Sequence, residues 1–136
     1  MHKQKGGHEM KQLLPDYTNC IANAANSILN KFEAGEGQQG LKMLDQYLKK
    51  DYENIVIILL DGMGKCIIDK NLKKDGFFQS HLAGIYSSVF PPTTVAATTS
   101  IANGLTPCEH GWLGWVCYYP QVDKNVTVFL RSCLAS

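Results

Sequence analysis

Charge is scarce in the second half of this 136-residue chain. Residues 76–136 hold four charged side chains, which are Glu109, Asp123, Lys124 and Arg131. Charged side chains normally cover a protein surface, so we expect this half to form the interior of something larger. The alternative is a compact half that the charged residues 1–75 cover. The net charge is only +1, which gives no global field to attract a nucleic-acid polymer or an acidic membrane.

Cysteine pairs that would mark a disulfide framework or a zinc ribbon are also missing. The chain has five cysteines, an odd number, and no two are separated by just two residues. This usage is typical of reduced thiols, so we expect a cytoplasmic protein. No apolar stretch near the start marks a secretory signal, and the longest aliphatic run, residues 55–60, is far too short to span a bilayer.

The order of the remaining patterns predicts an α/β fold. Residues 54–60 are continuous, aliphatic and rich in β-branched side chains, as in a strand buried on both faces of a parallel sheet. Apolar spacing predicts helices from about Pro15 to Phe32 and over residues 41–48, 65–72 and 94–102. A strand or an extended segment is expected over residues 85–89, and a further strand over residues 125–130.

Asp61 lies directly after the best strand, at the edge where open α/β sheets bind their ligands. Gly62 follows it and permits a tight turn. A carboxylate beside six aliphatic residues is costly to leave unpaired, and a divalent cation would satisfy it. Capping of the following helix would satisfy it equally well, so both roles stay open for Asp61.

Thr93 and Thr94 follow a Pro-Pro pair, which fixes an extended approach to the next helix. The backbone N–H groups at a helix start suit a phosphate oxyanion. A threonine hydroxyl is a nucleophile only when a base or a metal lowers its pKa, and Asp61 is one candidate metal ligand. Such a pairing suits phosphoryl transfer, whereas plain helix capping is the alternative for this segment.

Three other patterns are weaker. Cys108, Glu109 and His110 are adjacent, and adjacent residues seldom bind one zinc ion together. Residues 62–65 lack the spacing of a phosphate-binding P-loop. Trp112 and Trp115 suit either stacking on a base or simple packing.

Three segments in register, residues 57–62, 90–94 and 104–111, resemble the alkaline phosphatase superfamily, and above all its type I phosphodiesterase/nucleotide pyrophosphatase family. The resemblance implies a mostly parallel sheet flanked by helices and two divalent metal ions, zinc or manganese-like. It implies Asp61 as a metal ligand and Thr94 as both a metal ligand and the nucleophile. The implied reaction is hydrolysis of phosphodiester or pyrophosphate bonds in small phosphorylated or nucleotide substrates, through a phosphothreonine intermediate.

The chain departs from the family in two ways. Trp115 stands where diesterase members often have an asparagine that binds a phosphoryl oxygen, so a phosphomonoesterase, phosphomutase or phosphonate hydrolase is the alternative. The family also needs downstream Asp and His ligands that this chain lacks. We therefore expect residues 1–50 to be a tail and helical extension, and residues 51–136 to be an incomplete catalytic domain, inactive alone. A non-enzymatic α/β binding module is a third possibility.

Overall fold

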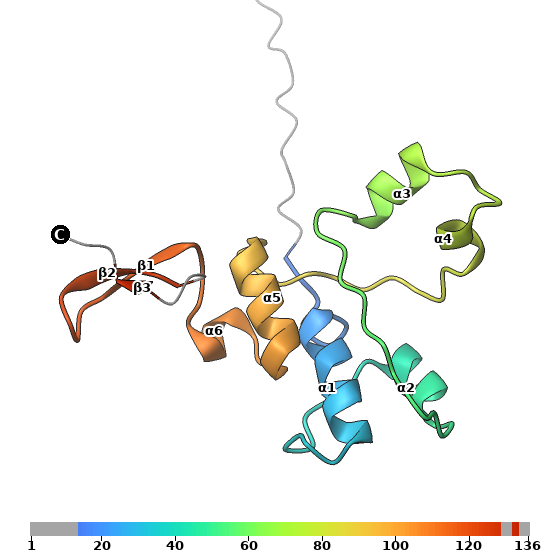
Figure 1. Ribbon diagram of the computed structural model, residues 1–136, viewed down its shortest axis with the longest axis horizontal. Helices are drawn as coiled ribbons and strands as arrows, with labels where there is room; N and C mark the ends of the chain where they lie inside the picture. The colour runs from blue at the N-terminus through green and yellow to red at the C-terminus, as the bar shows by residue number, and fades with distance from the viewer. Residues whose placement is uncertain (1–13, 129–131, 134–136) are drawn as a thin grey trace, which may run out of the picture.

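The computed structural model describes residues 14–128 and 132–133, which form a mixed α/β structure. In chain order its elements are α1 (Ile21–Lys31), α2 (Lys42–Leu48), α3 (Lys65–Asn71), α4 (Phe77–Ser80), α5 (Thr94–Asn103), α6 (Pro107–His110), β1 (Val116–Tyr119), β2 (Lys124–Thr127) and β3 (Ser132–Cys133). Figure 1 shows α1 beside α5, with the strands on one side of this pair and α3 and α4 on the other. No helix among the described residues is long and apolar enough to cross a membrane.

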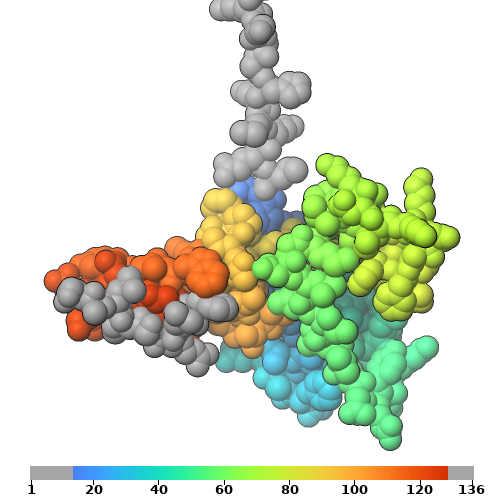
Figure 2. All heavy atoms as spheres, turned by 45° about the horizontal axis from the view of Figure 1, so that its top comes forward, coloured from blue at the N-terminus to red at the C-terminus, as the bar shows by residue number. Residues whose placement is uncertain are grey.

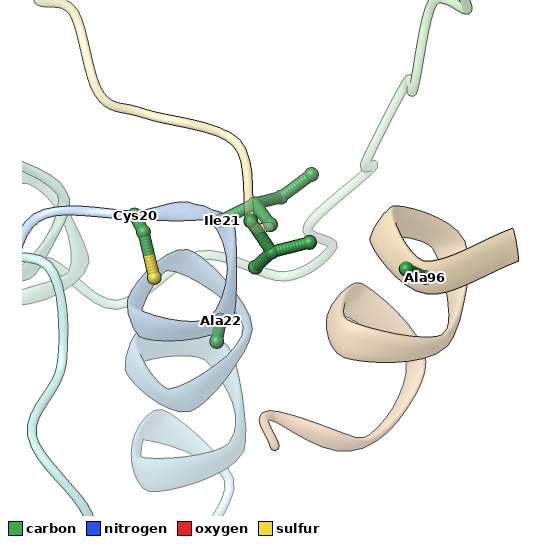
Figure 3. Packing of buried hydrophobic residues seen from close by; sticks show 5 residues of the cluster. Cys20, Ile21, Ala22 and Ala96 are labelled. Atoms are coloured by element: carbon green, nitrogen blue, oxygen red, sulfur yellow. The ribbon is translucent and has the colours of Figure 1, made fainter. Parts of the chain in front are cut away.

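Small side chains allow α1 and α5 to pack closely. The buried cluster between them consists of Cys20, Ile21, Ala22, Val89 and Ala96. Figure 3 shows Ile21 between the start of α1 and α5, with Cys20 and Ala22 on α1 and Ala96 on α5. Because alanine places only a methyl group between two backbones, the start of α5 is held close to α1. The helix that carries the two threonines therefore has a fixed position.

Polar side chains on α1 fasten both α5 and α2 to it. Asn26 donates a hydrogen bond from Nδ2 to the carbonyl of Gly104, just after α5, at 3.0 Å. Ser27 Oγ accepts the N–H of Leu41, just before α2, at 2.7 Å. Both side chains are buried, and buried polar groups need such partners. The apolar spacing that predicted α1 did not predict these two hydrogen bonds.

The predicted helices are largely confirmed. Those expected over residues 41–48, 65–72 and 94–102 are present as α2, α3 and α5. The first helix begins at Ile21 rather than near Pro15, because Asp16 Oδ1 instead accepts the Thr18 N–H at 2.9 Å and holds a turn. The short helices α4 and α6 were not predicted.

The sheet differs from the mostly parallel sheet that the sequence predicted. β1 pairs antiparallel with β2, with Val116 opposite Thr127, and β2 pairs antiparallel with β3. The expected strand at residues 125–130 corresponds in part to β2, and residues 129–130 lie outside the described part of the chain. Parallel pairing in the described part of the chain is a single bridge between Cys20 and Ser87, so the mixed α/β class is confirmed while no parallel sheet is present there.

Residues 54–60, the best predicted strand, follow an extended path but pair with no strand that the structure describes. Val56 and Ile58 are 80% and 77% exposed, and Figure 2 shows this green part of the chain on the surface near α5. Residues 85–89 likewise form no strand beyond the bridge at Ser87. A β-branched aliphatic run favours an extended backbone, but a strand also requires a neighbour, which is not a local property of the sequence.

Candidate active site

Asp61 leaves the extended segment at a tight turn. Gly62 has φ +64°, in the left-handed region that favours glycine. Helix α3 begins only at Lys65, with Gly64 as its N-cap. Asp61 is exposed and makes no hydrogen bond or ion pair to any described residue. The alternative in which Asp61 caps α3 is therefore wrong, and its carboxylate is available to a ligand.

Thr93 is the N-cap of α5, and its hydroxyl is fully engaged. Its Oγ1 accepts the Ala96 N–H at 3.2 Å and donates to the Leu113 carbonyl at 3.0 Å. The first bond satisfies one of the unpaired N–H groups at the helix start, and the second ties α5 to the loop after α6. The capping role is confirmed for Thr93, and a hydroxyl used in this way is a poor nucleophile.

Thr94, the first residue of α5, has a different environment. Its side chain is half-buried, and its hydroxyl makes no hydrogen bond to any residue that the structure describes. Only its backbone carbonyl is used, as the acceptor for Thr98 Oγ1 at 2.8 Å. The geometry thus separates two adjacent threonines, one that holds the helix and one with an unused hydroxyl. A nucleophilic role for Thr94 stays a prediction.

One open cleft of about 710 Å³ brings the two motifs together. Its lining comes from the end of the extended segment with α3, from the segment before the Pro-Pro pair, and from the start of α5. Figure 1 shows these three parts of the chain meeting beside α5. Asp61 and Thr94 both line this cleft, so the fold places the candidate metal ligand and the candidate nucleophile around one space.

The cleft carries one cation and one carboxylate in a lining that is otherwise neutral and mostly apolar. The cation is Lys65, whose ammonium pairs with Asp69 one turn further along α3. Asp69 also accepts a long hydrogen bond from Gln79 of α4, at 3.5 Å. A partly exposed pair at this helical spacing is worth about 0.5 kcal/mol or less. Lys65 can therefore exchange Asp69 for an anionic ligand.

The donors in the cleft do not complete a metal site by themselves. Within the part of the chain that the structure describes, no three His, Cys, Asp or Glu side chains gather where they could hold a metal ion. Asp61 supplies a carboxylate and Thr94 a hydroxyl, whereas a bound zinc ion needs about four donors. A metal ion here would require further ligands from outside the described residues.

Residues 104–111, the third motif, form a rigid connection between α5 and the strands. Gly104 and Gly111 end α5 and α6 with φ of +74° and +73°, as left-handed C-caps. Between them Glu109 accepts hydrogen bonds from the N–H and the hydroxyl of Thr106, both at 2.7 Å. These bonds, the backbone one above all, hold the pKa of Glu109 below its usual 4.5. The capping box holds α6 at a defined place after α5.

His110 joins the loop after α6 to α5. Its Nδ1 accepts the Trp112 N–H at 3.0 Å, and its Nε2 lies 3.1 Å from the buried Ser100 Oγ. Because Nδ1 accepts, the proton of the neutral ring lies on Nε2. Burial holds the pKa of His110 below its usual 6.5, although the hydrogen bond to the Ala96 backbone and the charge of Glu109 oppose this. Both ring nitrogens are thus occupied within the protein.

Sequence patterns missed two features of this site. Lys65 attracted no attention beyond its place after a glycine-rich turn, yet it is the cation of the cleft. The run from Cys108 to His110, considered as a metal cluster, divides instead: Glu109 bonds to Thr106, and His110 bonds to Trp112 and lies near Ser100. A Thr-x-x-Glu spacing was the available signal for the capping box.

Comparison of the chain with protein-family models, with curated proteins and with solved structures finds no match in any of the three.

Proposed function

We propose that this chain carries the nucleophile and one metal ligand of a hydrolase that cleaves phosphodiester or pyrophosphate bonds in small phosphorylated or nucleotide-like substrates. The main support is the cleft that Asp61 and Thr94 share. Its second support is the difference between the two threonines, since only Thr94 has an unused hydroxyl among described partners. The three motifs that resemble the type I phosphodiesterase/nucleotide pyrophosphatase family point to the same residues.

In the proposed reaction Thr94 Oγ1 attacks phosphorus while the bond to the leaving oxygen breaks on the opposite side. The product is a phosphothreonine whose phosphoryl group still carries the other substituent of the substrate, and the proton of the Thr94 hydroxyl ends on the departing group through water. A second water then cleaves the phosphothreonine, which releases the phosphorylated product and restores the hydroxyl. The backbone N–H groups of Thr94 and Val95 make no hydrogen bond to any described residue, so they and the positive end of α5 can bind phosphoryl oxygens. Lys65 adds a positive charge to the same cleft.

We propose two divalent ions as cofactors, zinc or manganese-like, with Asp61 and Thr94 as ligands to one of them. When bound, such ions lower the pKa of a hydroxyl and neutralise developing charge. The described donors fill only part of one coordination shell, so the remaining ligands would come from a continuation of the polypeptide. For that reason we expect the 136-residue chain to be inactive alone.

The exposed aliphatic segment fits the same proposal. In an alkaline-phosphatase-like fold, residues 51–136 would be part of a larger domain with a mostly parallel sheet flanked by helices. Residues 54–60 would be one strand of that sheet. Full burial of one such side chain contributes about 1.5–3 kcal/mol, so covering a run that includes Val56 and Ile58 would stabilise the complete domain strongly. Asp61 would then stand at the carboxyl end of a paired strand, where ligands of such sheets bind.

Substitution of Thr94 tests the proposed nucleophile. In the full-length protein that contains this chain, Thr94→Ala is expected to lower turnover of bis-p-nitrophenyl phosphate at least about 10³-fold. Thr94→Ser should retain part of the activity because it keeps a hydroxyl. Thr93→Ser is the matched control, since it keeps the capping oxygen and should act as the parent protein does. Full turnover by Thr94→Ala would overturn the assignment.

Metal content and turnover of the 136-residue chain test the missing ligands. Weak metal binding with no turnover is the expected result. Two tightly bound ions with turnover that depends on Thr94 would show that the chain, alone or as an oligomer, supplies every ligand.

A phosphomonoesterase, phosphomutase or phosphonate hydrolase is the second candidate, and Lys65 favours it. A cation in the cleft attracts the dianion of a monoester more than the monoanion of a diester. We expect Lys65→Met to lower kcat/KM for p-nitrophenyl phosphate about tenfold, more than for the diester. Lys70→Met, on the same helix but outside the cleft lining, is the control. Equal losses for both substrates would remove this argument for monoester preference.

A further inference from the structure

His110 makes no contact with Asp61 or Thr94 that the structure records, yet its hydrogen bonds lead to the start of α5. We propose that neutral His110 is a positioning residue, which determines that Thr94 rather than Thr93 has its hydroxyl available in the cleft. The functional meaning of this inference rests on the proposed function, but the structural coupling that it describes does not.

The coupling follows a short series of contacts. His110 Nδ1 accepts the Trp112 N–H at 3.0 Å, which fixes the chain directly after α6. One residue further on, the Leu113 carbonyl accepts the Thr93 hydroxyl at 3.0 Å. Thr93 Oγ1 in turn accepts the Ala96 N–H at 3.2 Å. The Thr93 side chain is therefore held in one orientation from both sides, with no hydrogen left to donate into the cleft.

His110 is itself held against α5. Its Nε2 lies 3.1 Å from Ser100 Oγ, and Ser100 is completely buried. Because Nδ1 is an acceptor, Nε2 carries the ring hydrogen and donates toward α5. The imidazole therefore connects the middle of α5 with the loop that returns to the start of α5.

Protonation of His110 removes one bond of this series. A protonated Nδ1 is a donor and cannot accept the Trp112 N–H, whereas Nε2 can still donate to Ser100. The nearest charged group is Glu109 on α6, and Thr106 already engages its carboxylate. Neither α5 nor residues 111–115 contain a charged side chain. The protonated Nδ1–H thus faces the Trp112 N–H donor with no new counter-charge, and the loop that carries the Leu113 carbonyl is released.

Release of that carbonyl changes the state of Thr93. Its hydroxyl hydrogen loses the Leu113 acceptor, and only the bond from the Ala96 N–H still holds the side chain. The less constrained Thr93 hydroxyl then competes with Thr94 for a phosphoryl group and for a metal ion at Asp61. For the proposed enzyme, turnover should therefore fall as the pH is lowered through the titration of His110.

Nuclear magnetic resonance of the 136-residue chain tests the coupling without an activity assay. Ring nitrogen shifts should show a neutral His110 with its hydrogen on Nε2 at pH 7.5. On acidification below pH 6.5, Trp112 amide exchange should accelerate at least about tenfold beyond its intrinsic pH dependence. The three-bond couplings that report the Thr93 rotamer should move toward an averaged value at the same midpoint.

Two variants make the result specific. His81→Gln removes a histidine at the end of α4 whose recorded hydrogen-bond partners are Ser80 and Phe77. It should leave the changes at Trp112 and Thr93 unaltered. His110→Gln should abolish the pH-dependent changes in Trp112 exchange and in the Thr93 couplings. If that variant fails to fold, the titration of the parent chain still tests the coupling between His110 and Thr93.

Two outcomes would overturn the inference: a ring hydrogen on Nδ1, or a Thr93 rotamer that stays fixed while His110 titrates. Failure of the proposed function appears separately, as turnover that persists in Thr94→Ala.

Discussion

Replacement of Gly104 by alanine should destabilise the chain more than the same change at Gly111, although the two backbones are nearly identical. Gly104 has φ +74° and Gly111 has φ +73°, and both end a helix as left-handed C-caps. Their surroundings differ. A Cβ at Gly104 would lie 2.0 Å from Asn26 Oδ1 and 2.9 Å from Asn26 Cγ, whereas a Cβ at Gly111 would meet nothing within 4 Å.

The expected magnitudes follow from these two environments. An alanine in the left-handed region costs about 1–2 kcal/mol, which is the whole effect expected at Gly111. At Gly104 the Asn26 side chain must also move, and it would lose its 3.0 Å hydrogen bond to the Gly104 carbonyl. A buried polar group left without a partner costs about 1–3 kcal/mol more. We therefore expect a loss of about 2–5 kcal/mol for Gly104→Ala.

Urea unfolding followed by circular dichroism measures both losses of unfolding free energy. The dependence of that free energy on urea concentration should be unchanged, which shows that each variant exposes the same surface on unfolding as the parent chain. The double variant Gly104→Ala with Asn26→Ala should lose less than the sum of the two single variants, because the clash is absent once Asn26 is shortened. Equal losses at Gly104 and Gly111, or simple additivity in the double variant, would refute the close approach of α1 to the end of α5.

Three further outcomes are expected. Thr93→Val should lower stability in thermal unfolding by about 1 kcal/mol through loss of the N-cap, while Thr93→Ser should not; equal effects would exclude the cap. Because the pKa of Glu109 is lower in the folded chain, its contribution to stability is present above pH 4.5 and is lost as the pH falls below that value. Glu109→Gln should remove this acid step, and persistence of the step would assign it to another group. The exposed aliphatic run around Ile58, which is 77% exposed, should promote self-association of the chain. Ile58→Glu should therefore reduce association in sedimentation without destabilising the monomer, whereas a destabilised monomer would place Ile58 in a buried environment.

Local signals predicted the helices well because helices are stabilised by neighbours in sequence. Helix α5 ends at Gly104, directly after Asn103, and an Asn-Gly pair is a common local signal for a helix end. Predicting the strands requires knowing which segments pair with each other, and no short segment contains that information. Residues 54–60 have the right composition but no partner in the described part of the chain, whereas β1 and β2 pair through a turn with Asp123 at φ +49°, which lacks a standard glycine signal.

The candidate site shows the same division. The sequence indicated Asp61 and Thr94 as a pair, and the structure places both around one cleft. The family resemblance favoured Thr94 over Thr93, but a physical reason for that choice needs the position of the Leu113 carbonyl, which lies in a loop twenty residues after Thr93. The capping alternative for Asp61 was a reasonable local inference, but the turn at Gly62 moves the helix start to Gly64.

The exposure of the extended segment 54–60 and the lack of a partner for the Asp61 carboxylate are linked. In the described structure Asp61 is exposed, so water can satisfy its charge at little cost. If neighbouring strands covered residues 54–60, the end of the strand would become less accessible to water, and an unpaired carboxylate there would be strongly unfavourable. A bound cation would remove that penalty. Completion of the sheet and binding of a metal at Asp61 should therefore favour each other, and a chelator should destabilise the complete domain more than it destabilises this chain.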